Sequence, residues 1–292
     1  MNVKQELVSF FIVGAPKAGT TSLYHYLESH PQVCMCSIKE PNFFSAEGLN
    51  NEPLYYEDPI ISDANEYAQL FNHCQLDSIK GEASVSYLFY PNTAAKIKAY
   101  NPSAKIIIIL RDPAKRAFSH WKMDERLGFV KKSLEQIIAE HHPGKFEPHY
   151  QQYVELGFYA KQIKRYKESF PENQLLIMFQ KDLRTSQTEM LQQLYHFLAI
   201  SEDHFPSEEE HNTAVKFKNP LLAALYTNKI IRSVAKKILP SNASSKLKSD
   251  LSEKDERNPS PLLMKDLYAL YKDDIVELET ILKISLSDWK HQ

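Results

Sequence analysis

The sequence has few cysteines, no strong charge of either sign and no long apolar run, and each shortage excludes a class of protein. Its three cysteines, Cys34, Cys36 and Cys74, form no C-x-x-C pair, and a C-x-C pair alone leaves a zinc ion short of ligands. We therefore expect reduced structural thiols and no metal site. A formal charge of −2 over 292 residues argues against a general nucleic-acid binder, because affinity for a phosphate backbone needs a basic surface.

Membrane segments and secretion signals are also missing from the sequence. No apolar stretch reaches about 18 residues, and the first residues contain no apolar run followed by a small-residue cleavage site. We expect a soluble, cytoplasmic protein. There is no internal repeat or low-complexity tract, and no carboxylate cluster suits a magnesium ion.

The sequence does contain an alternation of apolar strands and amphipathic helices. Strand patterns at 9–13, 78–84, 106–110 and 174–179 are separated by segments with helical spacing. The five consecutive branched apolar residues at 106–110 are typical of a parallel strand that is covered on both faces. This alternation predicts an α/β fold of three layers, with helices on both faces of a central parallel sheet.

The stretch "VGAPKAGTTS" joins the first strand to the first helix and is similar to a phosphate-binding loop. Gly14 and Gly19 have the spacing of a Walker A loop, but Thr20 stands where that loop has its lysine, and the lysine here is Lys17. A helix N-terminus, three consecutive hydroxyl residues and an ammonium group together predict an anion site. The alternative is a plain strand-to-helix turn, in which the glycines serve backbone geometry and the threonines cap the helix.

A second candidate anion site follows the strand at 106–110. In "LRDPAKRAFS", Asp112 can cap a helix that begins with proline, which leaves Arg111 at the strand end. Ser119 lies three residues after Arg116, on the same helix face. Ligands bind at the carboxyl ends of parallel strands, so the two loops together predict a nucleotide with phosphates at opposite ends of its ribose. Arg111 could instead pair with a neighbouring carboxylate.

Four motifs carry a resemblance to a known family: "VGAPKAGTTSL", "KEPNFF", "GEASVSYL" and "IILRDPAKRAFSHW". In this order, and more thinly to about residue 200, the chain resembles the sulfotransferases that use 3'-phosphoadenosine 5'-phosphosulfate (PAPS). It is most similar to the carbohydrate branch, with the heparan sulfate enzymes and bacterial relatives. The resemblance implies a metal-independent enzyme that moves a sulfuryl group from PAPS to a hydroxyl, or less often an amine, of a carbohydrate-like acceptor.

The resemblance also implies roles for single residues. The first loop would hold the 5'-phosphosulfate, with Lys17 beside the bridging oxygen on which charge develops. Glu40 matches the glutamate of the family's E-x-x-F-F motif, which would accept the proton of the attacking hydroxyl; from the residues alone it could be a solvated loop glutamate. Arg111 and Ser119 would hold the 3'-phosphate. The implied nucleotide-binding residues are Lys17, Ala18, Gly19, Thr20, Thr21, Ser22, Arg111 and Ser119.

The chain departs from the family pattern in three places. Residues 82–84 are Glu-Ala-Ser where the animal enzymes have E-K-[ST], so a substrate-side lysine is missing. Asn42 stands where some relatives have histidine, and both changes weaken the case for a heparan-like acceptor. The family's K-G-R-like loop near the C-terminus has no clear match. By position, Lys216 and Lys218 in "HNTAVKFKNP" are the candidate ligands.

The composition changes from about residue 206. Residues 216–248 contain eight lysines and arginines and no acidic residue. Such a segment can be the solvated edge of a packed helix, or it can contact an anionic acceptor or a membrane surface. We expect one domain over 1–292, with a nucleotide-binding α/β core in 1–205 and a helical, basic part in 206–292 that covers the active site.

Two other functions stay open at this point. A P-loop kinase has the same architecture, but Thr20 in place of the Walker lysine and the lack of an acidic strand end for magnesium disfavour it. A non-enzymatic protein that binds nucleotides or polyanions would keep the fold and use residues 216–248 as its surface. The presence of both Lys17 and Glu40 argues against this second alternative.

Overall fold

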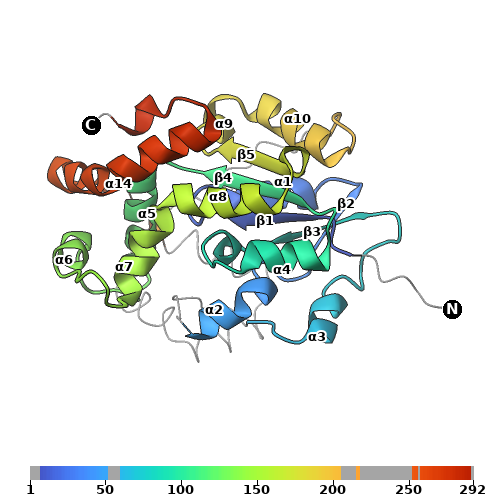
Figure 1. Cartoon of the computed structure of the whole chain (residues 1–292), viewed down its shortest axis with the longest axis horizontal. Coiled ribbons are helices and arrows are strands. Elements are labelled where there is room, and N and C mark those ends of the chain that lie inside the picture. The colour runs from blue at the N-terminus through green and yellow to red at the C-terminus, as the bar shows by residue number, and fades with distance from the viewer. Residues whose placement is uncertain (1–6, 52–59, 205–214, 218–251, 256, 291–292) are drawn as a thin grey trace.

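Five parallel strands form the central sheet. The computed structural model describes residues 7–51, 60–204, 215–217, 252–255 and 257–290 of the chain. The strands lie in the order β2-β3-β1-β4-β5, and every pairing between them is parallel (Figure 1). Their bounds are Phe10–Gly14 for β1, Val33–Met35 for β2, Ile79–Ala83 for β3, Lys105–Leu110 for β4 and Leu175–Phe179 for β5.

The strands contain the apolar runs that predicted them. All five residues of Ile106–Leu110 are fully buried, which confirms the prediction of a strand covered on both faces. The other three predicted strands are β1, β3 and β5. Strand β2 was not predicted, because its three residues at the sheet edge are too short to show a period.

The helices also follow the predicted pattern. Pro113 begins α5 and Asp112 caps it by accepting from the Lys115 N–H at 3.0 Å, as expected. Helix α9 ends at Thr185 and α10 begins at Gln187. The helices described are α1 (Thr20–Glu28), α2 (Ala46–Asn51), α3 (Ala64–Gln69), α4 (Thr93–Tyr100), α5 (Pro113–Arg126), α6 (Leu134–Ala139), α7 (Pro148–Tyr153), α8 (Tyr159–Ser169), α9 (Asp182–Thr185), α10 (Gln187–Leu198) and α14 (Pro261–Leu282).

Helices cover both faces of the sheet, so the predicted α/β architecture is confirmed. Helices α4 and α8 pack against each other on the face that is in front in Figure 1. Helix α1 lies behind the sheet in this view, beside α10. There His30, just after α1, contacts Tyr195 of α10, with 5.0 Å between the ring centres.

Helix α14 packs on α5 and α8 and is tied to the first turn of each. The Tyr268 hydroxyl donates to Asp112 Oδ2 at 2.6 Å. At the start of α8, the N–H groups of Tyr159 and Ala160 donate to the Asp274 carboxylate at 2.7 and 3.1 Å. The chain after residue 257 therefore becomes part of the wall around the end of β4.

Two short strands, β6 (Val215–Phe217) and β7 (Ser252–Lys254), lie between α10 and α14 in the sequence and pair with each other in antiparallel orientation. They were not predicted. The rest of the basic segment, 218–248, lies outside the described residues, and so does its predicted amphipathic helix. Within the described part, no helix is long and apolar enough to cross a membrane.

The expectation of reduced thiols is wrong for two of the three cysteines. Cys34 in β2 and Cys74, in the turn after α3, form a disulfide, and Cys36 is a buried free thiol. The partners are 40 residues apart in the sequence, and only the packing of α3 beside the sheet edge brings them together. A disulfide is typical of an oxidising compartment, so the cytoplasmic location stays a prediction without support from the cysteines.

A buried polar network holds the segment after β2 against the end of β3. Glu82 is fully buried and accepts hydrogen bonds from Tyr67 Oη at 2.5 Å and Ser84 Oγ at 2.7 Å. The Ser84 hydroxyl also accepts from the Asn42 N–H at 3.1 Å, and Ser86 Oγ donates to Asn42 Oδ1 at 2.6 Å. Burial raises the pKa of Glu82 to about 7, although its hydrogen bonds oppose the shift.

This pKa predicts a pH-dependent loss of stability that a single substitution removes. Between pH 4.5 and about 7 an unfolded glutamate ionises while native Glu82 stays protonated, so the folded state binds more protons and stability falls as pH rises. The loss should be about 3 kcal/mol. Glu82→Gln resembles the protonated carboxyl and should lack this slope.

Urea unfolding of both proteins from pH 4 to 8 measures the difference between them. Two aspartates with raised pKa, the buried Asp124 and the partly buried Asp274, add a similar slope to both proteins and cancel in the comparison. Parallel stability curves for the wild type and Glu82→Gln would show that Glu82 ionises normally in the folded state.

Candidate functional site

The three segments that contain the predicted catalytic and phosphate-binding residues lie side by side at the ends of β3, β1 and β4, which are neighbours in the sheet. The Glu40 segment follows β2 along the chain and packs against the end of β3. The first loop follows β1 and contains Lys17, whose carbonyl accepts a hydrogen bond from Arg111 Nη1 at 3.0 Å. Arg111 follows β4 directly. On the other side, the Glu40 N–H donates to the carbonyl of Ala83, the last residue of β3, at 2.9 Å. The structure thus gathers the three loops at one edge of the sheet.

The first loop is shaped to present backbone N–H groups. Gly19, with φ of 106°, precedes α1, and a Cβ at this position would lie 2.5 Å from Leu183 Cδ1. No side chain in the described part of the protein caps the first turn of α1. Ala18 and Thr20 are buried, whereas Thr21 and Ser22 are partly exposed. The turn therefore leaves free donors and two hydroxyls for an anion.

Lys17 is half-buried and its ammonium lies against α5. Its Nζ is 3.2 Å from Met123 Sδ. Burial, together with the nearby Arg111 and Arg126, lowers the pKa of Lys17 to about 8, although the Asp124 and Glu40 carboxylates oppose the shift. A lysine crowded by other cations and short of solvent favours a bound anion, which restores its charge.

Asp124 is the acidic residue on α5 that raises the pKa of Lys17 most strongly. It is buried and accepts from Tyr153 Oη at 2.9 Å. Burial raises the pKa of Asp124 to about 6, so its carboxylate is still charged at neutral pH. Sequence reasoning missed Asp124, because it lies outside any motif and faces Lys17 only once α5 packs.

A cavity of about 730 Å³ opens beside Arg111, between α5 and the start of α14. Arg111 and Ser119 both line it, as predicted for one phosphate. The volume suits a nucleotide. None of its lining residues, all in the described ranges, is acidic. The wall is Arg111, Lys115, Phe118, Ser119, Lys122, Arg257, Asn258, Pro259, Pro261 and Met264.

Two of these cations come together across the cavity wall and were missed from the sequence. Lys122 Nζ donates to the carbonyls of Asp255 and Arg257, each at 2.9 Å, and so fixes the segment before α14. The Arg257 guanidinium is oriented by Asp255 at 2.8 Å and Glu125 at 2.9 Å. Nothing in the local sequence marks Arg257, because its place depends on contacts with α5, 132 residues away.

Of the two lysines predicted from position, the structure describes only the backbone of Lys216. Lys216 lies in β6, where its backbone pairs with that of Glu253 in β7. Lys218 lies outside the described residues. Their role as nucleotide ligands stays a prediction, and Arg257 is the basic residue that the structure places near Arg111 on the C-terminal side.

Arg116, considered above as a second cation near Ser119, points away from the cavity. It is fully buried and donates from Nη2 to the Tyr153 carbonyl. His120 is also buried and lies near Gln152 at 3.2 Å, and burial lowers the pKa of its imidazole well below the usual range. Both side chains belong to the packing between α5 and α7, since α5 turns that face inward.

Glu40 lies at the surface side of this edge with a cationic neighbour. The Glu40 carboxylate forms an ion pair with Lys39, and both side chains are mostly covered, at 16% and 24% exposure. Glu40 has φ of 63° and Lys17 has φ of 65°, a left-handed conformation that is uncommon outside glycine. Such conformations cluster at functional sites, where surrounding contacts enforce them.

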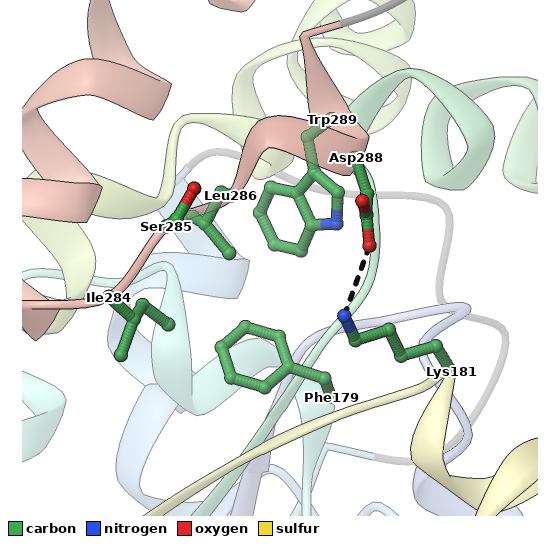
Figure 2. Close-up of a pocket in the computed structure, with 7 residues that line it drawn as sticks. All are labelled: Phe179, Lys181, Ile284, Ser285, Leu286, Asp288 and Trp289. Atoms are coloured by element: carbon green, nitrogen blue, oxygen red, sulfur yellow. Dashed lines mark hydrogen bonds and ion pairs between the residues drawn. The ribbon is translucent and has the colours of Figure 1, made fainter.

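A second, smaller hollow lies between the end of β5 and residues 284–289 (Figure 2). An ion pair between Lys181 and Asp288 closes one side at 3.1 Å, and the Trp289 ring lies 5.9 Å from that of Phe179. Its volume of about 60 Å³ can hold water but not a nucleotide. Of the described residues that line it, none was predicted as a site residue.

Comparison with known proteins shows the family of the chain. The sulfotransferase domain model matches residues 8–254 of the chain. The human bifunctional heparan sulfate N-deacetylase/N-sulfotransferase 3 is 28% identical over 206 residues, and the membrane-associated sulfotransferase kil1 of Dictyostelium discoideum is 34% identical over 140 residues. These alignments cover 66% and 46% of this chain but 22% and 28% of the relatives, so the chain spans about a quarter of their length.

Solved structures share this fold. A sulfotransferase from Alicyclobacillus acidocaldarius has a TM-score of 0.69 and 29% identity, covering 97% of this chain and 98% of that one. Mouse sulfotransferase SULT7A1, solved with PAP, shares the fold at a TM-score of 0.53 and 15% identity, covering 100% of this chain and 91% of its own. Because the family model spans most of the sequence, this chain belongs to the sulfotransferase domain family.

Proposed function

We propose that the protein transfers the sulfuryl group of PAPS to a hydroxyl of a carbohydrate-like acceptor. The observation that best supports this proposal is the hydrogen bond from Arg111 to the Lys17 carbonyl, which joins the uncapped turn of α1 to the cationic cavity. Two anion sites at this spacing suit a nucleotide with a phosphate at each end of its ribose. Family membership and the PAP complex of the mouse relative support the same nucleotide.

Each end of the nucleotide has its own set of residues in this proposal. The N–H groups of 19–22 and the Lys17 ammonium hold the 5'-phosphosulfate, and Ala18 contributes to the turn by donating its N–H to the Ala15 carbonyl. Arg111, Ser119 and Arg257 hold the 3'-phosphate from the cavity wall. The donors and cations of the chain neutralise both groups, and the scheme includes no metal ion.

Lys17 and Glu40 divide the transfer step between them. Glu40 accepts the proton of the acceptor hydroxyl as its oxygen bonds to sulfur. The bond between sulfur and the bridging oxygen breaks, and its electron pair stays on the 5'-phosphate, where Lys17 stabilises the charge. Lys39, which forms an ion pair with Glu40, fixes the direction of the carboxylate before the acceptor binds.

The acceptor class rests on the branch of the family that the chain resembles. The name of the human relative includes heparan sulfate, and its sulfation is on nitrogen. In this chain Glu-Ala-Ser at 82–84 lacks the substrate-side lysine of the animal enzymes, and Ser84 and Glu82 are buried in the network below Asn42. We therefore assign a hydroxyl of a carbohydrate-like compound, with an amine as the less favoured acceptor.

The direct test is transfer itself. The protein, with PAPS and a panel of glycans, glycolipids and phenols, should add a sulfo group to a carbohydrate hydroxyl in EDTA, and mass spectrometry locates the added group. Transfer to phenols alone would contradict the acceptor class. No transfer to any acceptor, together with no binding of adenosine 3',5'-bisphosphate, would contradict the function itself.

Substitutions at Glu40 and Lys17 should have different kinetic signatures. Glu40→Gln keeps the shape but cannot take a proton, so kcat should fall by about 10² to 10⁴-fold while affinity for the bisphosphate is unchanged. Lys17→Ala removes a charge that acts on the 5'-phosphate before and during transfer, so both affinity and kcat should fall. Steady-state kinetics measure kcat, and calorimetry measures affinity for the bisphosphate. Near-normal turnover of Glu40→Gln would show that another group is the base.

The low pKa of Lys17 predicts a pH limit on nucleotide binding. Above about pH 8 the free enzyme loses the Lys17 proton, so affinity for adenosine 3',5'-bisphosphate should fall about tenfold per pH unit. Asp124→Asn keeps an oxygen that can accept from Tyr153 but removes the negative charge that raises the pKa of Lys17. The pH above which affinity falls should therefore be about one pH unit lower in this variant. Asp288 is an exposed aspartate that forms an ion pair with Lys181, and Asp288→Asn is the matched control. If affinity begins to fall at the same pH in all three proteins, Asp124 is not the group that keeps Lys17 charged.

Arg257 should hold the 3'-phosphate specifically. Arg257→Ala should weaken adenosine 3',5'-bisphosphate at least about tenfold, the value of one charge-assisted hydrogen bond, and leave adenosine 5'-monophosphate unchanged. Lys181→Ala removes a cation outside the cavity and should affect neither nucleotide. Equal losses for both nucleotides in Arg257→Ala would mean that the residue shapes the fold rather than binding the 3'-phosphate.

A further inference from the structure

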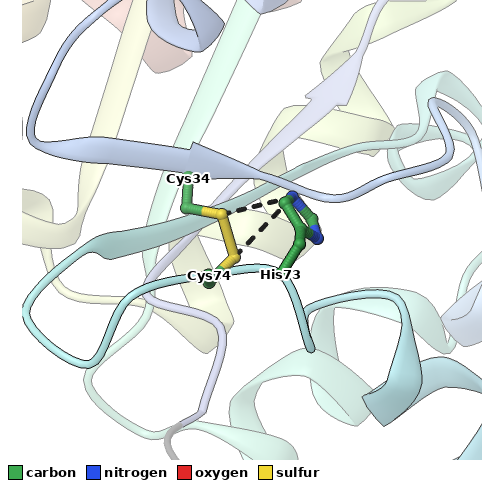
Figure 3. A group of neighbouring side chains, drawn as sticks. All are labelled: Cys34, His73 and Cys74. Carbon is green, nitrogen blue, oxygen red and sulfur yellow. Dashed lines mark hydrogen bonds between the residues drawn. A yellow bond between two sulfur atoms is a disulfide. The ribbon is translucent and has the colours of Figure 1, made fainter.

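A cluster of two cysteines and a histidine lies at the edge of the sheet away from the nucleotide cavity (Figure 3). Cys34 belongs to edge strand β2, and His73 and Cys74 follow α3. His73 is exposed and the two cysteines are half-buried. The proposed transfer reaction uses none of them, so the cluster needs a separate explanation.

The imidazole of His73 is directed at both sulfur atoms. Its Nε2 lies 3.3 Å from Cys34 Sγ and 4.0 Å from Cys74 Sγ. In a tetrahedral zinc site, with Zn–S of about 2.3 Å and Zn–N of about 2.0–2.1 Å, neighbouring sulfur and nitrogen ligands lie about 3.5 Å apart. The ring nitrogen therefore already has the spacing of a ligand to both sulfurs, and only the bond between the sulfurs prevents a metal from entering.

We propose that reduction of the Cys34–Cys74 disulfide turns this cluster into a binding site for a thiophilic divalent cation such as zinc. The two thiolates and His73 Nε2 supply three ligands, and water completes the tetrahedron on the exposed side. A dithiol reductant donates two electrons, breaks the S–S bond and becomes a disulfide itself. The two cysteine thiols then release their protons to water as the cation binds.

The third cysteine does not belong to this site. Cys36 is fully buried, and its sulfur is not part of the group of ligand atoms around His73. The partly exposed pair, Cys34 and Cys74, lies beside His73 and faces the solvent from which a cation would enter.

The position of the cluster gives the two states a common structural role. Cys34 and Glu40 belong to the same segment of chain, which passes through Ser37. The Ser37 N–H donates to the carbonyl of Leu70, in the turn after α3, at 3.1 Å. Helix α3 carries Tyr67, whose ring stacks on that of Phe43 with 4.3 Å between centres. Either the disulfide or the metal therefore ties the Glu40 segment to α3, so reduction exchanges one link for another.

Cobalt(II) is the probe that tests this site without any need for sulfotransferase activity. The whole protein is reduced with a phosphine, which takes up oxygen from water to become a phosphine oxide, and is then titrated under argon. The reduced protein should bind one cobalt ion and show thiolate charge-transfer absorption and the visible bands of tetrahedral coordination. The oxidised protein should show neither.

Matched variants identify the ligands. His73→Ala, at an exposed position, should fold normally and lower cobalt affinity at least about tenfold, and Cys34→Ser should abolish the thiolate absorption. His196→Ala, another exposed histidine, paired with Glu202, should bind as the wild type does. No thiolate bands in the reduced protein, full affinity in His73→Ala or surviving bands in Cys34→Ser would each overturn the proposal.

Discussion

The hydrogen bond from the Arg111 guanidinium to the Lys17 carbonyl is the contact on which the site depends. It exists because β1 and β4 are neighbours in a parallel sheet, so that both loops leave the sheet at the same edge. The bond fixes the main chain of the first loop, and Lys17 can then adopt its left-handed conformation and turn its ammonium toward α5. The apolar burial of β1 and β4 supplies the rigidity that holds this arrangement.

Cations concentrated at this edge create a site that is unfavourable when empty and favourable when an anion is bound. Burial and the neighbouring Arg111 lower the pKa of Lys17, while Asp124 limits the shift from inside the protein. Arg257 is held in place by acids that do not line the cavity, so its outer face stays available to a ligand. The protein thereby has its charge stabilisation arranged before the nucleotide arrives, and little reorganisation is needed when charge develops.

The sequence was sufficient for the parts of the structure that are local. The apolar run of β4, the cap at Asp112 and the glycine turn before α1 are encoded within a few residues each, and all appear as predicted. The family motifs pointed to Lys17, Glu40, Arg111 and Ser119, and the rule for parallel strands predicted the shared edge of the loops that contain Lys17 and Arg111. Their chemical roles are proposals that the geometry supports.

Apart from the short strands, the failures concern side chains whose partners are distant in the sequence. Cys34 and Cys74 were taken for reduced thiols because neither has a nearby partner, and only the turn after α3 brings them together. Arg257 and Asp124 were missed because packing on or by α5 gives each its meaning, whereas Arg116, with a suggestive position, turned inward.

The measurement that tests the proposed nucleotide site most directly compares two isomers, adenosine 3',5'-bisphosphate and adenosine 5'-diphosphate, by thermal unfolding in EDTA. At about a hundred times its dissociation constant the bisphosphate should add about 2.7 kcal/mol, or about 5 °C, and the diphosphate at the same concentration much less. Equal shifts would contradict a site built for phosphates at both ends of the ribose.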